Sequence, residues 1–177
     1  MIKTVDISVI SVVFFFIILV YCAYTDFRYG KIYNWVTYPS FLIGLFFNYV
    51  LYGKTGLYSG LIGAAAGGII FFAFYFISGL GAGDVKLMMV IGAFGGFKFV
   101  LWTLYYSSIV GFFVGIVLLT ANGLLKEGLR RSVLYIKGMF LPSNKKIGLG
   151  NTAKIKVPYG MIVVVGGYLA FFLKGLV

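Results

Sequence analysis

Two aspartates, Asp26 and Asp84, have the type and position that could support chemistry in this chain. Each lies at the border of a long apolar run, and Asp84 directly follows the glycine-rich residues 79–83. A charged side chain near a membrane core is costly and is normally kept for pairing or for function. Two carboxylates a few Å apart share a proton, so one can activate water while the other polarises a carbonyl group. The pair therefore predicts hydrolysis by a directly attacking water.

The rest of the sequence offers few other routes to catalysis. The chain has no histidine, and its one cysteine is Cys22, so a Ser-His pair is excluded and Cys22 lacks a histidine base. Two carboxylates alone would make a poor metal site, so we expect neither a metal ion nor a cofactor. Taken alone, Asp26 is also compatible with an interfacial loop acid that pairs with Arg28 or Lys31.

The motif Gly81-Ala82-Gly83-Asp84 places two glycines directly ahead of the second carboxylate. Without side chains, these glycines allow backbone or an extended substrate segment to come close to Asp84. Lys86 follows two positions later, and its charge could tune or orient the carboxylate.

The composition is that of an integral membrane protein. Of its 177 residues, 62% are hydrophobic and 11% are charged, and the mean hydropathy is +1.05. We therefore expect one polytopic domain over residues 1–177, an all-α bundle of about six transmembrane helices. The apolar runs predict spans at about 7–24, 34–52, 57–78, 84–95, 98–121 and 157–177.

The fourth of these spans is short, because residues 84–95 rise only about 18 Å along a helix axis. A fused helix over 84–121 is the alternative and would give five spans. That helix would carry Gly95, Gly96 and Lys98 in its middle, so a turn at the two glycines is favoured.

Basic residues dominate the charge, which is +11 at pH 7. In the six-span arrangement most of them, including Arg28, Lys86 and those of the loop 122–156, share one side, which the positive-inside rule makes cytoplasmic. We thus expect a multi-pass protein of the plasma or inner membrane with both aspartates at the cytoplasmic face. Within the loop, residues 124–141 form a basic amphipathic segment that suits anionic lipid headgroups. This location beside membrane spans disfavours nucleic-acid binding.

Three separated blocks carry a resemblance to a known family. They are residues 25–39 around Asp26, residues 81–87 around Asp84, and the segment Pro158-Tyr159-Gly160. They resemble the two aspartate blocks and the C-terminal signature of the type IV prepilin peptidases, which are membrane aspartic proteases of the GxGD class. The chain departs from the family at Tyr33, where many members have proline.

The resemblance implies an aspartic endopeptidase with Asp26 and Asp84 as its catalytic pair. The chain resembles the short form of the family, which has no N-terminal methylase or zinc domain and includes tight-adherence pilus peptidases and archaeal preflagellin peptidases. The implied substrate is a prepilin or preflagellin-like protein with a short basic leader. The alternatives are a small ion- or proton-coupled transporter using the same acids, and a structural subunit whose acids pair with Arg28 and Lys86. The sequence indicates neither the particular pilin nor an oligomeric state.

Single-cysteine labelling tests the predicted topology. After removal of the native cysteine, we expect cysteines placed at Arg28, Lys86 and Arg130 to label from the cytoplasmic side. Cysteines at Lys54 and Lys98 should label from the other side. Labelling of positions 86 and 130 from opposite sides would contradict the six-span arrangement.

Overall fold

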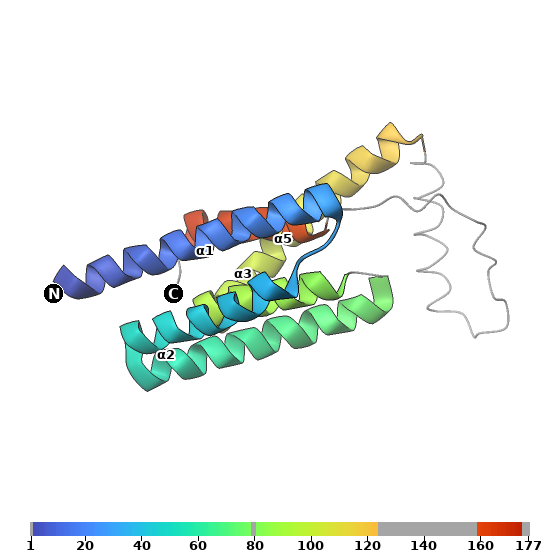
Figure 1. The fold of residues 1–177 in the computed structure, drawn as a ribbon. Helices are drawn as coiled ribbons and strands as arrows, with labels where there is room; N and C mark the ends of the chain where they lie inside the picture. The colour runs from blue at the N-terminus through green and yellow to red at the C-terminus, as the bar shows by residue number, and fades with distance from the viewer. Residues whose placement is uncertain (1, 79–80, 124–158, 175–177) are drawn as a thin grey trace. The chain divides into compact units, whose positions relative to one another are not determined.

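The computed structural model describes residues 2–78, 81–123 and 159–174, and the regular secondary structure within these ranges is α-helix (Figure 1). The helices are α1 (Ile2–Tyr29), α2 (Asn34–Ser78), α3 (Ala82–Ala121) and α5 (Tyr159–Lys174). Three of them contain stretches long and apolar enough to cross a membrane, and α5 is a shorter apolar helix. The expected all-α membrane class is confirmed. The basic residues 124–156 lie outside the described residues.

The chain divides into two compact units, residues 1–110 with 158–177, and residues 111–157. Both aspartates belong to the first unit, and the helices of that unit position them.

α2 reverses direction at Gly53, where the backbone has a φ of 63°. The first part of the helix then lies beside the second, as Figure 1 shows. A Cβ atom added at Gly60 would lie 3.0 Å from Leu45 Cδ2, whereas in a straight helix these positions would be roughly 22 Å apart. A left-handed φ is readily adopted only by glycine, which explains the residue at the break. The predicted boundary between two helical segments in this region is confirmed.

α3 breaks at Gly96, where φ is 71°, within the predicted turn at Gly95 and Gly96. A helix that ends here leaves carbonyl groups without intrahelical partners. The side-chain amide of Asn48 satisfies two of them, donating to the carbonyl oxygen of Ala93 at 2.6 Å and to that of Phe94 at 2.9 Å. Asn48 thereby ties the break in α3 to α2. Sequence analysis did not single out this residue.

Backbone-to-backbone packing joins the second part of α2 to the first part of α3. A Cβ atom added at Gly63 would lie 2.6 Å from the carbonyl oxygen of Gly92, and one added at Gly67 would lie 2.8 Å from that of Met88. Small residues four apart on facing helices permit this approach. The packing positions the short helical segment that begins near Asp84.

Aromatic side chains join α1 to α5 and to α3. The Phe16 ring stacks on Tyr168 of α5 with a centroid distance of 4.9 Å. The fully buried Phe15 ring contacts Phe94 and Phe99, which lie on either side of the break in α3. α1 and α5 lie side by side in Figure 1.

The glycine contacts predict how α2 and α3 respond to added methyl groups. Gly63→Ala should destabilise the protein by about 1–3 kcal/mol, because the methyl group would overlap the backbone of α3. Thermal unfolding in detergent should show a lower Tm. Gly115→Ala is the matched control, since no described atom lies within 4 Å of a Cβ atom at that position. An equal loss of Tm in both variants would argue against the close packing.

Candidate active site

The Asp84 side chain is held at the first turn of α3. Its Oδ2 atom accepts a hydrogen bond from the Gly81 backbone N–H at 3.0 Å, and the Asp84 N–H donates to the Gly81 carbonyl oxygen at 3.0 Å. This arrangement resembles the half of a capping box in which the third helical residue reaches back to the N-cap amide. Asp84 is only 5% exposed. Its carboxylate is therefore fixed by its own helix N-terminus.

The Asp26 side chain is held by a different helix. Asp26 lies one turn before the end of α1, and its Oδ2 atom accepts a hydrogen bond from the Met161 backbone N–H at 3.1 Å. α5 begins at Tyr159, so this amide belongs to the first turn, where N–H groups have no intrahelical acceptor. A Cβ atom added at Gly160 would lie 2.8 Å from the Asp26 Cγ atom. The missing side chain at Gly160 thus leaves room for the carboxylate.

The two carboxylates are held in the same way. Each lies at a helix N-terminus, whose partial positive charge attracts an anion. In the part of the chain that the structure describes, each accepts this one hydrogen bond through Oδ2. These hydrogen bonds fix the orientation of both carboxyl groups.

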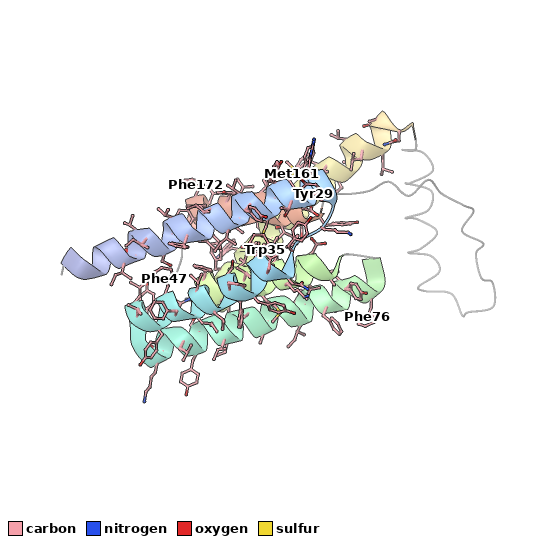
Figure 2. All side chains as sticks on the ribbon, in the orientation of Figure 1. Tyr29, Trp35, Phe47, Phe76, Met161 and Phe172 are labelled. Atoms are coloured by element: carbon pink, nitrogen blue, oxygen red, sulfur yellow. The ribbon has the colours of Figure 1, made fainter. Side chains whose placement is uncertain are left out.

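Ile32 connects the two carboxylates through the segment 30–33 between α1 and α2. A Cβ atom added at Gly83, the residue before Asp84, would lie 3.0 Å from Ile32 Cβ. One added at Gly160, which contacts Asp26, would lie 2.9 Å from Ile32 Cδ1. The structure thus brings at least one residue from each of the three sequence blocks close to Ile32 or Asp26. Figure 2 labels Tyr29 and Met161 at this end of α1 and α5.

Lys86 does not contact Asp84 in the structure. Its Nζ atom donates to Asn34 Oδ1 at 2.6 Å and lies 5.2 Å from the centre of the Tyr38 ring. Residues two apart on a helix point to different faces, which explains why Lys86 is directed away from the carboxylate. Lys86 therefore links α3 to the start of α2.

Of the predicted C-terminal segment, the structure describes Tyr159 and Gly160. Tyr159 is partly buried against the core, whereas Pro158 lies outside the described residues. Among the residues that the structure describes, no group of three or more His, Cys, Asp or Glu side chains could hold a metal ion. Sequence reasoning missed Ile32 and Met161. The only available signal for Met161 was its place in the first turn after the Pro-Tyr-Gly segment.

Comparison with known proteins identifies the family. Residues 13–116 match the sequence model of the type IV leader peptidase family, so the chain belongs to this family. The match includes both aspartates and confirms the resemblance found in the sequence. The chain is 36% identical over 91 residues to a prepilin leader peptidase/N-methyltransferase from Aeromonas hydrophila, an alignment covering 48% of this chain and 31% of that relative. No solved structure matches the chain.

Two glycines of α5 provide a test of the Asp26 contact. Gly160→Ala should displace the Asp26 carboxylate from the Met161 N–H and lower stability by about 1–2 kcal/mol. Gly167→Ala is the control, because its Cβ atom would lie 3.6 Å from the nearest atom, an ordinary contact. Thermal unfolding of the purified variants measures the difference. If Gly160→Ala unfolds at the wild-type temperature, the contact is not as close as described.

Proposed function

We propose that this chain is a membrane aspartic endopeptidase that removes the short basic leader from prepilin-like proteins at the cytoplasmic membrane face. The observation that carries the proposal is the pair of carboxylates, each held at a helix N-terminus by a backbone hydrogen bond. Membership of the type IV leader peptidase family supports the substrate class. The matched Aeromonas hydrophila protein is named as a prepilin leader peptidase.

The proposed reaction uses Asp26 and Asp84 as a proton-sharing pair. The ionised carboxylate takes a proton from a bound water, and the resulting hydroxide attacks the carbonyl carbon of the scissile peptide bond. The protonated partner donates to the carbonyl oxygen, and the leaving amine then takes up a proton as the C–N bond breaks. The hydrogen bonds from Gly81 and Met161 orient the two acids. Neither acid needs a histidine or a metal ion for these steps.

The reversals at Gly53 and Gly96 support six membrane crossings in one peptidase domain, because each divides a helix too long for a single span. Asn48 brings the two reversals to the same end of the helices. Asp84 lies at the other end of the segment 82–95, which rises roughly 21 Å, less than the hydrocarbon thickness. If the Gly96 end lies at one membrane surface, the Asp84 carboxylate therefore lies inside the opposite surface, because the segment is too short to reach it.

The distribution of lysines supports a cytoplasmic site. Lys54 follows Gly53 and Lys98 lies two residues after Gly96, whereas Arg28, Lys31 and Lys86 lie near the aspartates in the sequence. The positive-inside rule then places the aspartates on the side of the basic residues 124–156. We propose that this basic segment contacts anionic lipid headgroups of the same leaflet.

Replacing either acid by its amide tests the function. Asp26→Asn and Asp84→Asn should each reduce leader cleavage to background, because an amide can neither take a proton from water nor share one with its partner. Stability should be retained, since the amide oxygen can still accept the hydrogen bond from Met161 or Gly81. Coexpression with a prepilin, read as a mobility shift on a gel, measures cleavage.

Asp6→Asn is the matched control, because Asp6 lies near the opposite end of α1. It should cleave at the wild-type rate. Appreciable cleavage by a folded Asp26→Asn or Asp84→Asn variant would falsify the two-aspartate mechanism. If the wild-type protein leaves prepilins uncut and instead moves ions or protons in liposomes, the transporter alternative is correct.

A further inference from the structure

We infer that Ile32 is a spacer that sets the separation between the Asp26 and Asp84 carboxylates. Its side chain lies between two glycines, and each glycine is adjacent to one acid. Gly83 is bonded to Asp84, and a Cβ atom added at Gly160 would lie 2.8 Å from the Asp26 Cγ atom. Ile32 is therefore a positioning residue that acts through the backbone on both sides.

Ile32 is packed against the core cluster, and its side chain also approaches two glycine positions in helical first turns. Its Cβ atom is 3.0 Å from the place where a Gly83 Cβ atom would be, and its Cδ1 atom is 2.9 Å from the corresponding place at Gly160. Backbone within a helical first turn cannot rotate away as a side-chain end can. The β-branched side chain of isoleucine is itself restricted about χ1. The size of the Ile32 side chain thus determines how closely the N-termini of α3 and α5 can approach each other.

The connection that carries Ile32 is held at both ends. On one side the Gly30 N–H donates to the Asp26 carbonyl oxygen at 2.8 Å, with Gly30 at a φ of 60°, which closes the C-terminus of α1. On the other side the N–H groups of Val36 and Thr37 both donate to the Tyr33 carbonyl oxygen. A connection this short between two closed helix ends gives Ile32 little freedom to move.

The separation matters because one water and one peptide carbonyl must fit between the acids. A displacement of about 1 Å in a reacting group can cost about a hundredfold in rate. The expected loss of rate rests on the proposed function. The expected change in the distance between the two acids does not.

Distance measurement between spin labels tests the spacer directly. With Cys22 replaced by serine, labels can be attached at Phe27 and Ala82, which are exposed and next to or near the two acids. Ile32→Ala should shorten the mean distance, because α3 can then approach the α1 and α5 ends. Ile32→Val removes only the Cδ1 atom and should give a smaller shortening. If Ile32→Ala does not fold, the label distance in Ile32→Val alone tests the spacer.

Cleavage kinetics form the second readout. Ile32→Ala should lower kcat by about a hundredfold with little change in KM, since the reacting groups are misplaced while the leader still binds. Ile43→Ala is the matched control, because Ile43 is also a partly buried isoleucine packed against the core. It should lower Tm while leaving both the label distance and kcat at wild-type values.

The two proposals fail separately. A wild-type protein that cuts prepilins but keeps its label distance in both Ile32 variants overturns the spacer and leaves the peptidase standing. A wild-type protein that cuts nothing, but whose label distance shortens in the Ile32 variants, overturns the peptidase and supports the spacer. A distance change equal to that of Ile43→Ala would show a general loss of packing and also overturns the spacer.

Discussion

Helix ends within an apolar environment leave backbone polar groups that must find partners inside the protein, and the described structure depends on how this chain supplies them. Asn48 is the partner at the break in α3, where it donates to two carbonyl oxygens. Asp26 is the partner at the N-terminus of α5, and Asp84 at the N-terminus of α3. Three polar side chains thus form hydrogen bonds with backbone groups at three helix ends, and two of the three are the candidate catalytic acids.

This arrangement explains how the same carboxylates can be structural and chemically available. A helix N-terminus engages one oxygen of each acid and fixes the orientation of the group. Each carboxyl group is thereby held in one orientation, which is the preorganisation that a water-activating pair requires. A surface ion pair with a long lysine or arginine would hold the acid less firmly. Lys86 donates instead to Asn34.

Glycine has three different uses around this site. At Gly63, Gly67 and Gly92 its missing side chain lets α2 and α3 approach until backbone atoms are in contact. At Gly53 and Gly96 its left-handed φ permits the reversals. Near the acids, the glycines at 83 and 160 leave the space that Ile32 and the Asp26 carboxylate occupy.

The sequence by itself determined the all-α membrane class, the two aspartates, the glycine spacing and the positions of both helix breaks. These features are local, because apolar length and glycine position act within a few residues along the chain. Only the tertiary structure decided which groups meet. The Met161 amide binds an acid 135 positions earlier, and Lys86 binds a residue 52 positions earlier. Ile32 is an ordinary apolar residue in sequence. Its proposed role comes from the packing of two distant backbone segments, at Gly83 and Gly160, against it, which no local pattern specifies.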